Sequence, residues 1–545
     1  GEPAVAEVRY LPSFRPRFSR RDGGPGRRPA SAAARQRRIS GTRSGPATAG
    51  CHGAAGPRVA RPPERSGTSA PGAGLRLSGG PRHLADAVAG GLADLAALRV
   101  DEPRLELTFT AAGAPWFLAL FGRDSLITGW EALAAGPGLA VQGLHSLASF
   151  QGRADDPATG EQPGRIPHEI RIGGTEYFGI PAGSPYYDTV DASPLFVMLL
   201  AEAYRWGTGA DTVGGLLPAA RAALDWCDAH TDEAGYLCYQ AGQGSPGGAG
   251  RPGRPSRLAN QGWKDSAGSM VHADGSLAIP PVSLAEAQAY LWAARTGLAE
   301  LEERLGDPGR AGPLRASAAR LREAFHRDFW LPGQGLAAMA RDGSGRPLAV
   351  AASNMAHCLW TGLLRPDAAA AVAARLTAPD LSSGFGLRTL GTGERGYNPL
   401  GYHVGTVWPH DTAIAIAGLA ACGHGGLAGR LAADLLAAAA AFGFRFPELY
   451  GGFSRADMPR PVRYPLACLP HAWSAAAPLL VLRSLLGLDP DIPSGQVRLA
   501  PVLPDGMSLT VHGIPLGTAG NLAVRAEGTA AEVLSAPPGI EVTVG

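Results

Sequence analysis

The sequence predicts a mainly α-helical protein: a toroid of helices with a small C-terminal β appendage and a disordered N-terminal stretch. Three observations predict it. About a dozen segments place apolar residues at helical spacing, Gly/Pro-rich loops join them, and short alternating runs replace them near the C-terminus. We therefore divide the 545 residues into a largely disordered segment 1–81, a helical domain 82–489 and a β appendage 490–545.

The N-terminal segment is set apart by its composition. Between Arg15 and Gly74 the chain is rich in Arg, Pro, Gly, Ser and Ala and has almost no aromatic or branched apolar residues. Such a segment cannot bury enough surface to offset the entropy lost on ordering, so we predict disorder. The alternative is an Arg-rich arm that binds anions, and we favour the unstructured extension.

The helices of the second segment are predicted from periodicity. In 284–305, for example, Leu291, Leu298 and Leu305 lie on one stripe. Ser193 and Pro194 mark the start of another helix, as an N-cap and a first-turn proline. The other predicted helices cover 83–98, 123–135, 139–150, 214–230, 308–330, 353–363, 366–377, 409–422, 426–442 and 470–486.

The C-terminal segment changes period from helix to strand. Short alternating runs separated by Gly/Pro turns predict a small antiparallel sheet. These runs cover 497–499, 508–511, 522–524, 532–534 and 541–544.

Composition and motifs exclude several classes of function. The formal net charge of +2 argues against a dedicated nucleic-acid binder, which normally carries a strong basic excess. There is no P-loop, no GxGxxG after a strand and no serine-hydrolase elbow, so we predict no cofactor and no serine nucleophile. The six cysteines form no CxxC pair and stand beside no His at ligand spacing, so we predict no metal.

The expected location is the cytoplasm. The N-terminus lacks the apolar core of a signal peptide, and no run reaches the apolar length of a membrane span. Isolated cysteines inside apolar segments fit a reducing compartment. We expect a soluble protein without a membrane partner.

The long loops carry the unusual side chains. Trp, Tyr, His, Arg, Asp and Glu gather in them beside Gly and Pro, which is the composition of a sugar-binding surface. Compact domains seldom keep loops this long without a function. The loops cover 105–122, 151–190, 231–281, 379–408 and 443–468.

One candidate segment runs from Trp116 to Ser125. Arg123 and Asp124 stand at the start of a predicted helix and can offer a fork of donors and two acceptor oxygens to neighbouring sugar hydroxyls. A helix N-cap with a surface ion pair explains the spacing equally well.

A second candidate is Asp265, in the loop Asn260 to Ser266. A carboxyl beside the indole of Trp263 loses water, so its pKa rises and it can stay protonated near neutral pH, as an acid catalyst requires. An ammonium of Lys264 that reached the carboxylate would oppose this, although adjacent side chains often point apart. The alternative is a solvated loop carboxylate.

A third candidate is Glu448, which follows a proline and has apolar neighbours. Such a Glu is either a working base or the partner of a nearby Arg. Spacing alone favours the ion pair.

Aromatic and imidazole side chains gather between Tyr397 and Thr412. A zinc site from His403 and His410 is one interpretation, but no third ligand is in step with them. A sugar platform is favoured. Separately, Asp191 precedes a predicted helix and could meet a hydroxyl or help to cap that helix. The platform residues are Tyr402, His403, Trp408 and His410.

Taken in order, these segments resemble a known family. The motifs are PWFLALFGRDSLIT, YYDTVDASPLFVMLL, NQGWKDS, YNPLGYHVGTVWPHD, FPELYGGFSR and YPLACLPHAWSAAAPLL. The chain is similar to bacterial amylo-α-1,6-glucosidase-like proteins of the glycogen debranching enzyme glucosidase-domain family, over roughly 82–500. More distantly, it resembles trehalases, glucoamylases and glycoside hydrolase family 63.

The resemblance implies an (α/α)6 toroid and an inverting mechanism. The family's general acid matches Asp265 and its general base matches Glu448. Arg123 and Asp124 match the pair that holds the non-reducing glucose. The residues that match the walls of that pocket are Asp191, Trp408 and His410.

The chain departs from the family at its N-terminus. Relatives carry a β-rich domain there, and segment 1–81 would be a remnant of it. In such enzymes this domain can close over the active site, so its loss bears on stability and activity.

The expected function is release of glucose from α-glucosides, of the debranching type, with a carbohydrate as the partner. One alternative is a hydrolase of a small α-glucoside such as glucosylglycerate or trehalose. Another is a truncated, non-catalytic carbohydrate-binding protein. Inversion requires the two carboxyl groups to stand about 6.5–9.5 Å apart, which only the fold can arrange.

Overall fold

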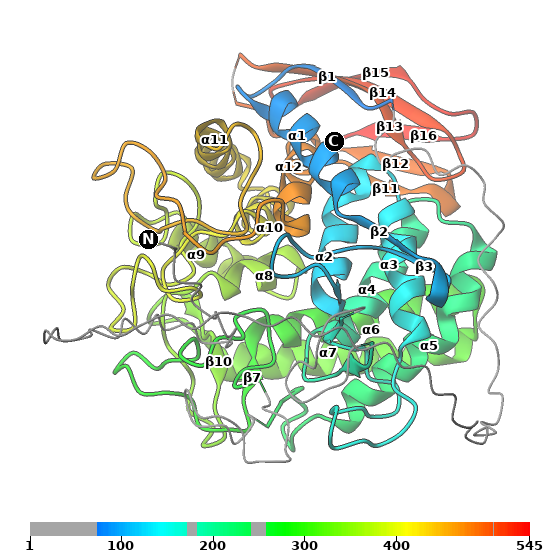
Figure 1. The fold of residues 1–545 in the computed structure, drawn as a ribbon. Helices are drawn as coiled ribbons and strands as arrows, with labels where there is room; N and C mark the ends of the chain where they lie inside the picture. The colour runs from blue at the N-terminus through cyan, green and yellow to red at the C-terminus, as the bar shows by residue number, and fades with distance from the viewer. Residues whose placement is uncertain (1–73, 172–182, 241–257, 505) are drawn as a thin grey trace, which may run out of the picture.

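The computed structural model describes residues 74–171, 183–240, 258–504 and 506–545 (Figure 1). The predicted disorder of the N-terminal segment therefore lies mostly outside the described residues. The part of that segment that is described includes a strand, β1 (Arg76–Gly79).

The described residues are mostly helical, and a helix stands at each predicted place. The helices are α1 (Leu84–Ala97), α2 (Gly122–Glu131), α3 (Gly138–Ser149), α4 (Ala192–Arg205), α5 (Ala210–Ala229), α6 (Ala285–Leu305), α7 (Ala311–Asp328), α8 (Asn354–Trp360), α9 (Pro366–Leu376), α10 (Pro409–Ala421), α11 (Gly425–Ala441) and α12 (Ala472–Leu486). Short 3-10 turns cover Pro103–Leu105, Ala132–Ala135, Pro308–Arg310 and Ile492–Ser494.

The start of α4 differs from the prediction. The helix begins at Ala192, so the N-cap position belongs to Asp191, and Ser193 lies inside the first turn. Neither side chain caps the helix: the Ser193 hydroxyl accepts a hydrogen bond from the Ile166 N–H at 3.0 Å. A serine followed by proline is typical of an N-cap, but here the serine hydroxyl is hydrogen-bonded to the backbone N–H of Ile166 instead.

The even-numbered helices form a closed ring. Each of α2, α4, α6, α8, α10 and α12 packs against the next, and α12 packs against α2. The odd-numbered helices form a second layer, in which α3, α5, α7, α9 and α11 each pack on the preceding even helix and α1 packs on α12 (Figure 1).

The sequences of the two layers match their positions. All ten residues of α2 are buried, as are nearly all of those of α12. In contrast, α7 buries one stripe, including Ala318, Leu321 and Phe325, as expected of a helix with one face in solvent. The hydrophobic core therefore lies within the ring and between the layers.

The C-terminal strands form two sheets, which Figure 1 shows gathered at one end of the molecule. One sheet has the order β1-β13-β14-β15 and the other has the order β11-β12-β16. The strands are β11 (Asp489–Asp491), β12 (Gln496–Leu499), β13 (Ser508–Pro515), β14 (Asn521–Glu527), β15 (Ala530–Ser535) and β16 (Glu541–Val544).

The prediction of a single antiparallel appendage is wrong in two respects. Strand β16 pairs with β12 in parallel, from Gln496 opposite Glu541 to Leu499 opposite Val544. Strand β1, from the other end of the described chain, pairs with β13. Alternation reveals a strand but not its partner, so pairings between distant segments cannot be read from it.

Small sheets stiffen the loops. The strands β4 (Leu120–Phe121), β5 (Glu169–Ile170) and β6 (Pro185–Tyr186) form an antiparallel sheet that leads directly into α2. The other short strands, in pairs, are β2 (Arg99–Glu102) with β3 (Leu107–Thr110), β7 (Ser283–Leu284) with β10 (Ala340–Arg341), and β8 (Trp330–Leu331) with β9 (Leu336–Ala337).

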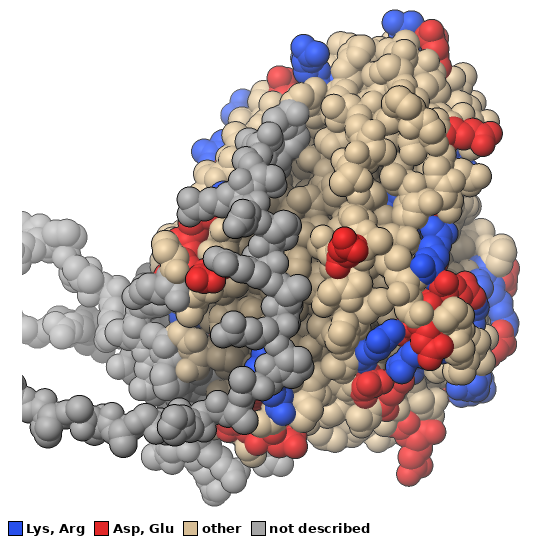
Figure 2. All heavy atoms as spheres, turned by 90° about the vertical axis from the view of Figure 1, so that its right-hand side faces the viewer, with Lys and Arg blue, Asp and Glu red and all other residues tan. Residues whose placement is uncertain are grey.

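Charges of both signs are mixed on the face shown in Figure 2, where Arg and acidic side chains lie side by side. Exposed ion pairs such as Arg315 with Glu303 follow this pattern. Among the described residues, no helix has both the length and the apolar character needed to cross a membrane.

Candidate active site

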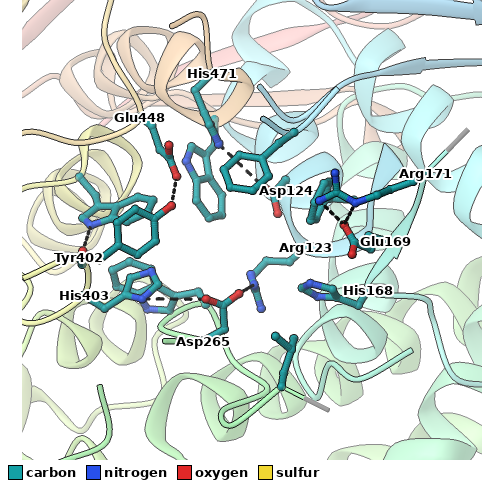
Figure 3. Close-up of a pocket in the computed structure, with 16 residues that line it drawn as sticks. Arg123, Asp124, His168, Glu169, Arg171, Asp265, Tyr402, His403, Glu448 and His471 are labelled. Atoms are coloured by element: carbon teal, nitrogen blue, oxygen red, sulfur yellow. Dashed lines mark hydrogen bonds and ion pairs between the residues drawn. The ribbon is translucent and has the colours of Figure 1, made fainter. Parts of the chain in front are cut away.

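A pocket opens near the N-terminal ends of α2, α10 and α12 (Figure 3). It holds about 560 Å³ of empty space, counting the open space at its mouth. The residues that line it are Phe117, Phe121, Arg123, Asp124, His168, Glu169, Arg171, Leu258, Trp263, Asp265, Tyr402, His403, Trp408, Glu448, His471 and Trp473.

Most of the residues predicted from the sequence meet at this pocket. Asp265 and Glu448, 183 positions apart in the sequence, both line it. The other predicted residues that line it are Arg123, Asp124, Trp263, Tyr402, His403 and Trp408.

Three predicted residues lie elsewhere. Trp116 is 39% exposed, and its carbonyl accepts a hydrogen bond from Arg171 Nη1 at 3.3 Å. Asp191 lies behind the pocket wall, fully buried. His410 lies beneath the wall, stacked on Trp473 with ring centroids 3.8 Å apart.

Arg123 connects Asp191 to Asp265. Its Nη1 donates to Asp191 Oδ2 at 2.9 Å, and its Nη2 donates to Asp265 Oδ2 at 3.3 Å. Asp191 also accepts from Thr189 Oγ1 at 2.6 Å, so it orients the arginine. Arg123 is thereby held with its guanidinium directed at a pocket carboxylate.

The alternative of a surface ion pair at the start of α2 is wrong, because Arg123 and Asp124 are both buried. The N-cap position belongs to Phe121 and makes no side-chain cap. The Gly122 N–H donates to His168 O at 2.8 Å, which fixes the first turn against β5. The helix start is therefore built to hold two charged side chains in the pocket.

Asp265 is a partly buried carboxyl that faces the pocket. Burial raises its pKa to about 7, with a further rise from the charge of Asp124, while the charge of Arg123 opposes the shift. The Lys264 ammonium does not reach it and donates instead to Thr389 O at 2.6 Å. Such a carboxyl is protonated over part of the neutral range, as a proton donor must be.

Glu448 lies on the other side of the pocket in Figure 3. The Tyr402 hydroxyl donates to its Oε1, and the Cys468 N–H donates to its Oε2 at 3.0 Å. Burial raises its pKa to about 7 in spite of these two hydrogen bonds. The alternative of a nearby arginine partner fails for Arg445, which pairs with Asp94.

The pocket also holds a second carboxylate–guanidinium pair, which the sequence did not predict. Glu169 Oε2 accepts from Arg171 Nε at 3.1 Å, whereas Glu169 Oε1 is buried and has no hydrogen-bond partner among the described residues. Burial raises the pKa of Glu169 to about 7, against the charge of Arg171. The run His168 to Arg171, in which Glu169 and Ile170 form β5, carries only a weak alternation signal.

His471 and Trp473 were also missed. His471 Nε2 lies 3.9 Å from Asp124 Oδ1, and burial lowers the pKa of the ring to about 3, so the imidazole is neutral. Burial also raises the pKa of Asp124 to about 6, although Arg123 opposes this. His471 and Trp473 lie in the motif YPLACLPHAWSAAAPLL. The apolar residues around them made this motif look like an ordinary core helix.

The imidazoles show no metal-binding arrangement. His403 Nδ1 lies 2.9 Å from Ser266 Oγ, and neither ring nitrogen of His410 has a hydrogen-bond partner in the part of the chain that the structure describes. Within the described part of the chain, no group of three or more His, Cys, Asp or Glu could hold a metal ion.

Comparison with protein families shows what class of protein this geometry belongs to. The family described as "Mannosylglycerate hydrolase MGH1-like glycoside hydrolase domain" matches residues 124–445, more than half of the 545 residues. The chain belongs to this family of glycoside hydrolases. A search of curated proteins finds no match.

Solved structures give the same fold. The GH63 mannosylglycerate hydrolase from Thermus thermophilus, in complex with glucose, is 17% identical with a TM-score of 0.54, over 73% of this chain and 100% of that one. Its complex with Tris and D-glycerate gives 18% identity and a TM-score of 0.52, over the same shares of the two chains. A GH78 family rhamnosidase of Bacillus sp. GL1 is 15% identical with a TM-score of 0.55, over 86% of this chain and 42% of that one.

Proposed function

We propose that this protein is an inverting hydrolase of small α-glycosides that releases glucose or a closely related hexose. Asp265 is the general acid, Glu448 is the general base, and the scaffold is an (α/α)6 toroid. One observation supports this proposal most directly. Asp265 and Glu448, whose pKa values are raised to about 7, line one pocket, and Arg123 donates a hydrogen bond to Asp265. The closed ring of helices and the family membership support the scaffold.

The proposed reaction requires one proton donor and one proton acceptor. Asp265 gives its proton to the glycosidic oxygen as the bond from that oxygen to the anomeric carbon breaks. Glu448 takes a proton from a water whose oxygen bonds to the anomeric carbon from the opposite face. The products are the inverted sugar and the free alcohol, and the two carboxyls exchange protonation states until solvent restores them.

The other pocket residues have proposed binding roles. Arg123 and Asp124 contact the hydroxyls of the non-reducing sugar, and Trp263, Tyr402, His403 and Trp408 form its walls. Asp191 acts through Arg123, and His410 acts through Trp473. Trp116 is proposed to contact the leaving group at the mouth, next to Arg171.

A small substrate with an acidic leaving group suits this pocket better than a glucan branch. The family to which the chain belongs is described by a mannosylglycerate hydrolase, an enzyme of a small glycoside. Arg171 supplies a cation at the wall, and a related hydrolase has been crystallised with D-glycerate. Glucosylglycerate and mannosylglycerate are therefore the first substrates to test.

The test is a panel of glucosylglycerate, mannosylglycerate, trehalose and a branched α-glucan, followed by proton NMR. We expect hydrolysis of a glycerate glycoside with the β-anomer appearing first. First release of the α-anomer overturns the inverting mechanism. Faster release from the glucan would assign the chain to the debranching type, and sugar binding without turnover would make it a non-catalytic carbohydrate-binding protein.

A further inference from the structure

Lys264 is the single lysine of the 545-residue chain, and it precedes Asp265 directly. Its side chain is 1% exposed, although lysine is rarely buried without a partner. Burial lowers the pKa of its ammonium to about 8, and the charges of Asp411 and Glu286 oppose this shift. A buried cation therefore stands next in sequence to a carboxyl group of the pocket. Its contacts show what keeps it buried.

The contacts of Lys264 lead away from Asp265 to a distant segment. Its Nζ donates to Thr389 O at 2.6 Å, across 125 positions of sequence. The same ammonium lies 5.0 Å from the ring centre of Trp263, which lines the pocket. The loop that carries Asp265 is therefore anchored through its lysine to Thr389.

Thr389 continues the connection on its other side. Its N–H donates to Thr406 O at 2.9 Å, and its Oγ1 accepts from the Gly405 N–H at 2.8 Å. The Thr406 hydroxyl in turn donates to Tyr402 O at 2.7 Å. This places the anchor of Lys264 in direct contact with segment 402–408.

Segment 402–408 is hydrogen-bonded to Glu448, the second carboxyl of the pocket. The Trp408 Nε1–H donates to Tyr402 O at 3.0 Å, which fixes this tyrosine, and the Tyr402 hydroxyl donates to Glu448. A series of hydrogen bonds therefore joins Lys264, the neighbour of Asp265, to Glu448, through backbone groups and through side chains that are buried or partly buried.

We propose that Lys264 is a positioning residue that joins the loop carrying Asp265 to the segment holding Glu448, and so fixes the spacing of the two carboxyls. This inference rests on the proposed function, because the spacing matters only if the two carboxyls act together on one glycosidic bond. A displacement of about 1 Å between catalytic groups costs on the order of 10²-fold in rate. The ammonium suits the role because a charged donor binds a carbonyl more strongly than a neutral one does.

The decisive variants are Lys264→Met and Lys264→Arg, with Arg322→Met as the matched control. Arg322 is a partly buried cation that also donates to carbonyls, those of Leu363 and Leu364, and it does not line the pocket. For Lys264→Met we expect kcat to fall about 30-fold or more, with KM changed less than about threefold, because geometry rather than binding is lost. Lys264→Arg should recover most of kcat, whereas Arg322→Met should lower only the thermal midpoint.

A second variant covers the case in which Lys264→Met does not fold. Thr389→Ala removes the hydroxyl link to Gly405 but keeps the carbonyl that Lys264 binds, and Thr389→Ser keeps both. We expect kcat to fall about tenfold in Thr389→Ala and to stay near wild type in Thr389→Ser.

The experiments distinguish failure of the positioning role of Lys264 from failure of the proposed function. Wild-type kcat in folded Lys264→Met, or in Thr389→Ala if the first variant does not fold, overturns the positioning role and leaves the proposed function intact. A wild-type enzyme that hydrolyses none of the glycosides overturns the proposed function, and this inference fails with it.

Discussion

Four carboxyl groups line one small pocket, and burial is the first cause of the raised pKa of each. Burial raises the pKa to about 6 for Asp124 and to about 7 for Glu169, Asp265 and Glu448. Water that would stabilise the ionised forms is excluded, and the carboxylates repel one another. The protein therefore keeps protons on some of these groups near neutral pH, where free carboxylic acids have lost them.

The pH profile of hydrolysis follows from the two proposed roles. Glu448 must be ionised, so kcat/KM rises as pH rises through its pKa; Asp265 must be protonated, so kcat/KM falls as pH rises through its own. Because both pKa values are raised to about 7, we expect a narrow bell with its maximum near pH 7. Measuring kcat/KM from pH 4 to 10 checks this. A flat profile between about pH 5 and 9 is incompatible with the assigned pair.

Replacing the proposed general acid should separate the effect on activity from the effect on stability. For Asp265→Asn we expect kcat to fall by about 10²–10⁴, the usual contribution of a general acid. The pKa of Asp265 is raised on folding, so its stabilising contribution is present below pH 3.8 and is lost as pH rises towards 7. The variant should therefore raise the thermal midpoint by about 1–3 °C at pH 8, and by less at pH 4.5.

Calorimetry at the two pH values measures this difference. A midpoint at pH 8 that is equal to or lower than that of the wild type would mean that the carboxylate is not destabilised by its surroundings. Leu258→Ala, at the pocket wall without a charge, is the matched control: it should lower the midpoint equally at both pH values.

Residue chemistry could be predicted from the sequence only where a motif carried it. Arg123, Asp265 and Glu448 stand in conspicuous sequence motifs, and the structure brings them to one pocket. Glu169 has no such motif, because it reaches the pocket through the pairing of β5 with β4. Asp191 reaches the pocket only through Arg123, a distinction that sequence spacing does not contain.

At the scale of elements, the first turn of α2 sets the positions of Arg123 and Asp124 in the pocket. A Cβ on Gly122 would lie 2.1 Å from Pro167 O, a backbone atom that cannot turn aside. Gly138, the first residue of α3, has nothing within 4 Å of its Cβ position. Gly122 and Gly138 each begin a helix, but only Gly122 lacks the space for a side chain.

We expect Gly122→Ala to displace Arg123 and Asp124, lowering kcat/KM by about 10²-fold and the stability by about 1–3 kcal/mol. Gly138→Ala should leave kcat/KM unchanged and the stability within about 0.5 kcal/mol. Denaturant unfolding and steady-state kinetics measure both. Equal effects of the two substitutions would show that contact with Pro167 does not set the position of α2.

The elements themselves differ in how far the sequence predicts them. Helix periodicity is a local signal, so α6 at Ala285–Leu305 and α9 at Pro366–Leu376 agree with the predicted 284–305 and 366–377. The parallel pairing of β12 with β16 joins segments about forty residues apart, and no local pattern specifies it. Local periodicity predicts elements, whereas their partners depend on the whole fold.

At the scale of the whole molecule, the ring directs the starts of several helices toward the pocket. Phe121, Trp408 and His471 occupy the N-cap positions of α2, α10 and α12, and all three line the pocket. The positive ends of these helix dipoles therefore lie at the pocket. A closed ring of helices can thus collect residues from distant motifs at one end.

Strand β1 forms one edge of the four-stranded C-terminal sheet. β1 pairs with β13 along four positions, from Arg76 opposite His512 to Gly79 opposite Leu509, and no residue of β1 lines the pocket. A chain that begins at residue 82 loses this strand, whereas a chain that begins at residue 74 keeps it. A comparison of these two chains therefore measures the contribution of residues 74–81 alone.

Without β1, the backbone donors and acceptors of β13 on that side lose their partners and β13 becomes an edge strand, which invites association. We expect the shorter chain to melt about 3 °C or more below the longer one and to form dimers or larger species in size-exclusion chromatography. Its kcat at 25 °C should match that of the longer chain, because the pocket lies on the ring. Equal melting temperatures would show that β1 adds nothing to the sheet, and a selective loss of kcat would show that the sheet supports the pocket directly.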